Sequence, residues 1–249
     1  MKERRALYLD HIVHFVDENP QEAVNHWKEL GFQAVVGGQH LKWGTHNALF
    51  YVKDCYIEWL AVENVDIANG ANHPLTKLLL HDKLGFGTIC LRTEAIEEVD
   101  KRLQAHGFDT SGVLQAERRT STGKLIQWQM LFVEEEVSNQ LPSPFFIQWQ
   151  EDDPVRLENL RKSGALLTEN EVLEIEKCIL GVHDVAASTE KWTRLLGGKL
   201  NLANCRIEFK ATDRGKERLE KVVFKNAVQE VTFAEGVYAL PEKGNNKGN

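Results

Sequence analysis

One acidic side chain in the N-terminal part of the sequence stands where it can do chemistry. Glu58 lies between Ile57 and Trp59, in an expected strand that is apolar on both faces. A buried carboxylate is costly unless it is paired, hydrogen-bonded or bound to a cation. Glu58 is therefore either paired with a nearby charge such as Lys42 or Arg92, bound to a metal ion, or a general base facing a substrate.

A histidine in an earlier expected strand is a second candidate. His11 shares its face of the strand with Leu9, Val13 and Phe15. These neighbours leave two interpretations open: a hydrogen-bonded histidine of the core, or a ligand that offers a ring nitrogen to a metal ion. His14 points to the opposite face and is expected to be structural.

Further polar residues come from the segment Trp43-Gly44-Thr45-His46-Asn47, which begins a strand expected to pair antiparallel with the strand of Glu58. A slip of one residue decides which side chain shares the face of Glu58, so either His46 or Asn47 lies beside it. His46 is a candidate fourth ligand, proton shuttle or substrate-binding group, or else it stabilises the turn. Trp43 and Asn47 are candidate substrate contacts.

The elements that must position these residues recur along the chain. Residues 6–65 are expected to form a strand, a helix and three strands. Asn19 and Pro20 are suited to the start of the helix, and Gly31 to its end. Residues 84–150 repeat the same order. We therefore expect two modules of equal design.

The last strands of the two modules correspond closely. Tyr56-Ile57-Glu58-Trp59 matches Phe146-Ile147-Gln148-Trp149, so Gln148 takes the place of Glu58. Gln127 lies on the preceding expected strand, where its alternation with Trp128 allows it to line the same hollow as Gln148. Both glutamines are candidate substrate-binding residues.

The rest of the chain is less regular. Residues 151–174 are polar and are expected to form a helical linker, and residues 175–235 a partial third module. Within that module, Arg206-Ile207-Glu208-Phe209 echoes the Glu58 segment a third time. Residues 242–249 are rich in Gly, Asn and Lys and are expected to be disordered, because they have nothing to bury.

Composition excludes several classes of protein. The chain has 249 residues and a formal net charge of −7, with its basic residues dispersed, which disfavours nucleic-acid binding. There is no apolar run of about 18 residues that could span a membrane, and no pattern of a secretory signal. The four cysteines have no metal-site spacing and are expected to be buried thiols of a cytoplasmic protein.

Paired modules of this kind resemble the vicinal oxygen chelate superfamily, which includes glyoxalase I, the extradiol dioxygenases and the bleomycin-resistance proteins. Three segments are similar to its glyoxalase-like domain family: Leu9-Asp10-His11-Ile12-Val13, Trp43-Gly44-Thr45-His46-Asn47 and Tyr56-Ile57-Glu58-Trp59-Leu60. The resemblance implies an α+β fold, in which paired βαβββ modules form a half-open, cup-shaped sheet with a third partial module beside it.

The resemblance also implies a metal site. Enzymes of the superfamily bind a divalent metal such as Zn, Ni, Mn or Fe with residues from the first and last strands of each module. Transferred to this sequence, the ligands are His11, Glu58 and Gln148. The fourth position falls on Gly87, which has no side chain, so three protein ligands would leave positions open for water or substrate.

The leading hypothesis is a glyoxalase-like protein that binds a small oxygen-bearing molecule in the cup. With a metal bound, a lyase or isomerase reaction is expected, in which Glu58 can serve as the base. Ring cleavage of the extradiol type would also need His46 beside His11. The alternatives are a metal-free binding or sequestration module and a regulatory protein without chemistry. A homodimer is considered, because modules exchange between chains in the superfamily.

Overall fold

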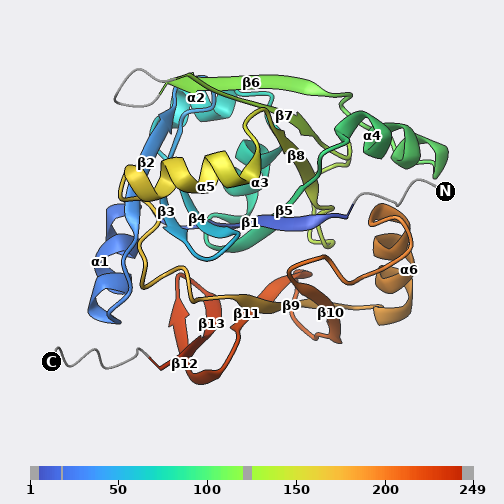
Figure 1. Ribbon diagram of the computed structural model, residues 1–249. Coiled ribbons are helices and arrows are strands. Elements are labelled where there is room, and N and C mark those ends of the chain that lie inside the picture. The colour runs from blue at the N-terminus through green and yellow to red at the C-terminus, as the bar shows by residue number, and fades with distance from the viewer. Residues whose placement is uncertain (1–5, 18, 120–124, 243–249) are drawn as a thin grey trace, which may run out of the picture.

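A computed structural model describes residues 6–17, 19–119 and 125–242, which form two β-sheets with helices packed around them (Figure 1). The larger sheet has eight strands in the order β2-β3-β4-β1-β5-β8-β7-β6, and the smaller has five in the order β10-β9-β11-β13-β12. The larger sheet curls into a half-barrel that is open on one side (Figure 1). The predicted α+β class with a cup-shaped sheet is confirmed.

The first half of the cup follows the order strand, helix and three strands. Its helix begins after Asn19, whose side-chain oxygen accepts a hydrogen bond from the amide of Gln21 at 3.0 Å, and ends before Gly31, which has a φ of 85°. The bounds are β1 Tyr8–Phe15, α1 Gln21–Glu29, β2 Val35–His40, β3 Thr45–Tyr51 and β4 Tyr56–Val62.

The second half has the same order and continues the same sheet. β5 pairs antiparallel with β1 in the middle of the cup, and parallel β8 follows on its other side. The bounds are β5 Gly85–Arg92, α4 Ile96–Ala105, β6 Leu114–Arg119, β7 Leu125–Leu131 and β8 Phe145–Trp149.

Two helices between the halves had no counterpart in the sequence-based expectations. α2 spans Val65–Gly70 and α3 spans Pro74–Asp82. α3 lies inside the curl of the large sheet (Figure 1), where Leu78 and Leu79 pack against a cluster that includes Phe15. Much of the concave side of the sheet is therefore filled by the protein's own side chains.

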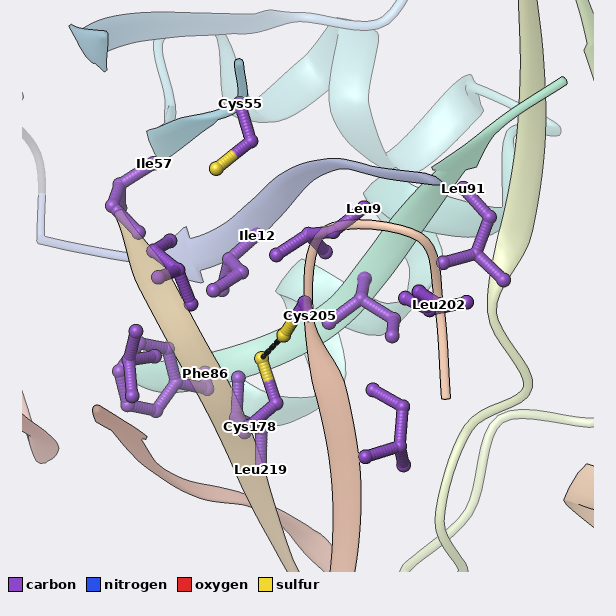
Figure 2. Packing of buried hydrophobic residues seen from close by; sticks show 14 of the residues in the cluster. Leu9, Ile12, Cys55, Ile57, Phe86, Leu91, Cys178, Leu202, Cys205 and Leu219 are labelled. Atoms are coloured by element: carbon purple, nitrogen blue, oxygen red, sulfur yellow. Dashed lines mark hydrogen bonds between the residues drawn. The ribbon is translucent and has the colours of Figure 1, made fainter. Parts of the chain in front are cut away.

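The smaller sheet covers the convex side of the large one. It follows a helix that crosses the open side of the cup (Figure 1). Figure 2 shows the core between the sheets, where Cys205 lies 3.8 Å from Cys178, sulfur to sulfur, facing Leu9 and Ile12 of β1. The bounds are α5 Asp153–Lys162, β9 Ile175–Val182, α6 Val185–Leu195, β10 Arg206–Ala211, β11 Arg218–Phe224, β12 Ala227–Phe233 and β13 Gly236–Pro241.

Two expectations from the sequence concern a membrane-spanning helix and the C-terminal tail. Within the described residues, no helix is both long enough and apolar enough to cross a membrane. The tail expected to be disordered lies outside the described residues from position 243 onward.

Gly87 is required for packing inside the cup. A Cβ added at this position would lie 2.4 Å from Cζ of Phe15, and the Phe15 ring is fully buried. We expect Gly87→Ala to lower the free energy of unfolding by about 1–3 kcal/mol through overpacking. Urea denaturation measures it, with Gly70→Ala as the control, because no atom lies within 4 Å of a Cβ built there. Equal stability of the two variants would contradict this account.

Candidate functional site

His11 is brought to the concave side of the sheet by an irregularity in β1. The pairing of β1 with β5 shifts between Leu9 and His11, so that His11 lies opposite Cys90. Bulges of this kind re-aim side chains and are common near functional sites. Here the bulge lets two sequence neighbours meet: Nδ1 of His11 lies 2.8 Å from Oδ1 of Asp10, although neighbours in a regular strand point apart.

The carboxylate of Asp10 fixes the orientation of the His11 ring. Its side chain is fully buried, and its other oxygen accepts hydrogen bonds from Nη1 of Arg92 and Nε1 of Trp149, each at 3.0 Å. Burial alone would raise the pKa of Asp10, but the hydrogen bond with His11 and the charges of Arg156 and Arg92 hold it well below its ordinary value. An ionised carboxylate only accepts hydrogen bonds, so Nδ1 of His11 carries a proton.

Glu58 faces the other ring nitrogen of His11. Oε2 of Glu58 lies 3.5 Å from Nε2 of His11, and Oε1 accepts a hydrogen bond of 2.6 Å from the side-chain amide of Asn47. Asn47 is itself held by the amide of Gly38 at 2.9 Å. A Cβ at Gly37 would lie 1.9 Å from the Asn47 oxygen, so a glycine there makes room for this contact. Lys42 and Arg92, the alternative partners considered from sequence, do not provide the contacts of Glu58.

The register of β3 against β4 settles which polar residue lies beside Glu58. Leu49 pairs with Glu58 and Asn47 with Leu60. Because side chains alternate along a strand, Asn47 shares the face of Glu58 and His46 points the other way. The structure therefore does not bring His46 to His11 and Glu58.

Trp43 contributes to a different part of the cup. It packs partly buried against the concave cluster, and its ring stacks on His73 with centroids 4.0 Å apart. Neither ring nitrogen of His73, which is 7% exposed, has a hydrogen-bond partner in the described part of the chain. Sequence reasoning did not identify His73, because the helix that it precedes was not expected.

The two candidate glutamines do not belong to the concave cluster, but both line a cleft beside it. Gln148 accepts a hydrogen bond of 2.8 Å from the amide of Ile96, at the start of α4, whereas its neighbour Ile147 packs in the concave cluster. Gln127 is exposed and donates to Glu117 at 3.2 Å. Ile147 and Trp128, one residue away from each glutamine, pack in the concave cluster instead, so a role of Gln127 and Gln148 in substrate binding stays a prediction.

The described residues fit a divalent cation only in part. Nε2 of His11 and Oε2 of Glu58 converge, and a metal-bound histidine typically donates its other N–H to a carboxylate, as His11 does to Asp10. Asp10, His11 and Cys90 also offer ligand atoms within 4.8 Å of one another. The oxygens of Asp10 are already used, however, and burial raises the pKa of the Cys90 thiol. The fit therefore rests on His11 and Glu58.

A helix that sequence reasoning treated as a linker supplies another residue to the site. Leu157 and Leu160 of α5 pack against Tyr51 and Tyr56 at the open side of the cup. From the same helix, the guanidinium carbon of Arg156 lies 5.2 Å from the centroid of the Trp149 ring, whose N–H bonds Asp10. The helical linker expected for this segment gave no sign of that contact.

A cleft with a volume of about 840 Å³ opens where α5 begins. It is lined by the ends of β5 and β8 and the beginnings of β1 and β7, among them Arg92, Trp128, Trp149 and Asp153. Pockets of this size hold small molecules in other proteins. The cleft adjoins the Asp10 network because Arg92 and Trp149 belong to both.

Comparisons with known proteins agree with this architecture. A family model described as glyoxalase-like domain matches residues 9–196. A hypothetical protein from Staphylococcus aureus is similar over 93% of this chain and 98% of its own, with 26% identity and a TM-score of 0.77. Methylmalonyl-CoA epimerase from Mycobacterium tuberculosis matches over 63% of this chain and 97% of its own, with 16% identity and a TM-score of 0.43. No curated protein sequence matches.

Proposed function

This chain belongs to the glyoxalase-like domain family of the vicinal oxygen chelate superfamily, and on that premise we propose that its cup binds a small oxygen-bearing molecule and moves a proton on it. The observation that carries the proposal is the row of Asp10, His11 and Glu58 on the concave side of the sheet. Asp10 fixes the ring, and the second ring nitrogen then faces a carboxylate.

This row favours a positive charge between His11 and Glu58. With its proton on Nδ1, neutral His11 presents a lone pair to an oxygen of Glu58 only 3.5 Å away. Two electron-rich atoms at this separation are stabilised by a second proton on the ring or by a cation. A divalent metal such as Zn, Ni, Mn or Fe would be held by His11 and Glu58 and would polarise a substrate carbonyl.

The chain's own residues have distinct tasks in the proposed reaction. Glu58 accepts a proton from a carbon next to the substrate carbonyl and returns it, which is isomerase or lyase chemistry. Asn47 orients the carboxylate of Glu58 through its amide hydrogen bond. Asp10 keeps His11 in one tautomer, and α5 limits the access of water to the concave side.

One observation favours a second candidate, a metal-free binding module. Cys90 lies opposite His11, Ile147 packs where the second module would supply a carboxylate or amide, and Gln148 turns to α4. The second half of the cup then offers apolar contact in place of ligands. A flat ligand packed against aromatic side chains such as Trp149 would suit this function.

Metal analysis decides between the two candidates. The untagged protein is dialysed against metal-free buffer, Mn, Zn, Ni or Fe(II) is added back, and bound metal is measured after removal of the excess. We expect about one metal per chain, lost in His11→Ala, which removes one of two ligands, and in Glu58→Gln, which removes the negative charge of the other. Glu208→Gln is the matched control, since Glu208 sits in a similar segment of the smaller sheet and pairs with Lys177.

Stoichiometric binding that survives both substitutions would contradict the assignment of His11 and Glu58. No binding under any of these conditions would contradict a metal-dependent reaction and favour the binding module. We further place the protein in the cytoplasm, supported by its four buried free cysteines.

A further inference from the structure

We propose that the ligand of this protein carries a carboxylate, that Arg156 of the helix across the cup binds it, and that Asp153 occupies its place in the ligand-free protein. The inference rests on the proposed function for where the reacting part of the ligand lies. The carboxylate contact itself stands on Arg156, Asp153 and Arg92.

Arg156 has hydrogen-bonding capacity that the described protein does not use. Its side chain is only 11% exposed, and its Nε is buried without a hydrogen-bond partner among the described residues. Its Nη2 donates a hydrogen bond of 3.2 Å to Oδ1 of Asp153. A buried donor without a partner carries a desolvation cost that a ligand oxygen would relieve.

The free edge of Arg156 matches the geometry of a carboxylate. Nε–H and Nη2–H of an arginine point the same way and bind the two oxygens of one carboxylate in parallel. In this structure Nη2 reaches one oxygen of Asp153, while Nε has none. The Trp149 ring beneath the guanidinium holds it in place. Arg156 is therefore positioned for a second, better-aligned carboxylate.

Asp153 is the group that a ligand would replace. Its two oxygens are divided between two arginines, with Oδ1 near Arg156 and Oδ2 2.9 Å from Nε of Arg92. Its side chain is 41% exposed and lines the 840 Å³ cleft, whereas Arg156, to which it is bonded, is not among the lining residues. Asp153 is the exposed half of both ion pairs, so its carboxylate can turn into solvent while a ligand carboxylate takes its place beside the two arginines. Arg92 keeps its buried partner Asp10 when Asp153 moves away, so the exchange leaves the His11 network intact.

The charges around the cleft favour one carboxylate over larger anions. Glu94, Glu151 and Asp152 also line it, and they would repel a ligand with several negative charges. Trp128 and Trp149 offer aromatic faces for the remainder of the molecule. The ligand class is therefore a monocarboxylate whose other end is apolar or aromatic.

Calorimetric titration of the full-length protein tests this with phenylacetate and acetate, and with phenylacetamide as the neutral twin. We expect phenylacetate to bind more tightly than phenylacetamide. Arg156→Gln is expected to weaken phenylacetate binding at least about tenfold, because a charge-assisted pair of hydrogen bonds is lost. Asp153→Asn is expected to act in the opposite direction and to strengthen it about tenfold, because the internal competitor is gone.

Arg161→Gln is the matched control on the same helix, since Arg161 is exposed and pairs with Glu171. This variant should bind phenylacetate as tightly as the parent protein. Equal affinity for phenylacetate and phenylacetamide would overturn the inference, as would unchanged binding in Arg156→Gln. The inference would also be overturned if Asp153→Asn bound neither acetate nor phenylacetate. Binding that persists in His11→Ala and Glu58→Gln would uphold the inference even where the proposed reaction fails.

Discussion

Arg218→Ala is expected to lower the free energy of unfolding by about 3 kcal/mol, because it removes the bidentate partner of a buried carboxylate. Nε and Nη2 of Arg218 donate to the two oxygens of Asp82 at 2.6 and 2.9 Å, and the Asp82 side chain is only 3% exposed. The same guanidinium also donates to the backbone oxygens of Ser138 and Gln140, each at 2.7 Å. The substitution removes this donor from the two backbone oxygens and leaves Asp82 with Lys216 and His81, at 3.2 and 2.7 Å from its Oδ1.

The ion pair of Asp82 and Arg218 joins two parts of the fold. Asp82 ends α3, which fills the concave side of the cup, whereas Arg218 begins β11 of the smaller sheet. Urea denaturation measures the effect. Arg214→Ala serves as control, because Arg214 is 62% exposed and lies 3.7 Å from its partner Glu220. A loss in Arg218→Ala no larger than in the control would contradict this role.

Mild acid is expected to destabilise the protein through two buried histidines. Burial lowers the pKa of His14 to about 4, against a smaller opposing effect of its hydrogen bond with the Ala234 carbonyl. Burial also lowers the pKa of His73 to about 3, and the nearby His40 adds to this. The ordinary value is 6.5 in both cases, so between that pH and about 4 the unfolded chain binds protons that the folded chain does not.

The stability that these two histidines contribute is therefore fully present above pH 6.5. It is lost as the pH falls toward their pKa values in the folded protein. Each histidine contributes a slope of about 1.4 kcal/mol per pH unit, and His14 alone roughly 3 kcal/mol in total. Urea denaturation at a series of pH values from 7 to 4 measures the slope.

His73→Phe is the informative variant, because phenylalanine retains the stacking on Trp43 and has no nitrogen to protonate. We expect the number of protons taken up on unfolding in mild acid to fall by about one per chain. The free energy of unfolding at neutral pH should be equal or higher, since two unpartnered polar atoms are removed. His183→Phe, at a position where the side chain is 46% exposed, is the control. An unchanged slope in His73→Phe would show that the buried ring does not titrate as described.

Much of the fold was predictable because it follows local rules. The start of α1 at Asn19 and its end at Gly31 depend on capping chemistry that is visible in a single sequence. The candidate pair of His11 and Glu58 was identified because an ionisable residue in an apolar strand is conspicuous. In the same way, Asp10 in the strand of His11 could have been singled out as a buried carboxylate.

What could not be predicted depends on registers and bulges. The bulge in β1 sets His11 opposite Cys90, whereas a fixed sequence offset set it against Gly87. One residue of shift likewise turns Gln148 toward α4. The hydrogen bond between Trp149 and Asp10 joins residues 139 positions apart in sequence, and that between Arg218 and Asp82 joins residues 136 positions apart. No local pattern encodes such pairings.

The helix across the cup has a kinetic consequence. No residue of α5 is fully buried, so its backbone amides should exchange with solvent through small, local openings, whereas those of β1 should exchange only on global unfolding. Ligand exchange through the open side of the cup would then be limited by the opening of one short helix. The rest of the protein would remain folded through each cycle of uptake and release.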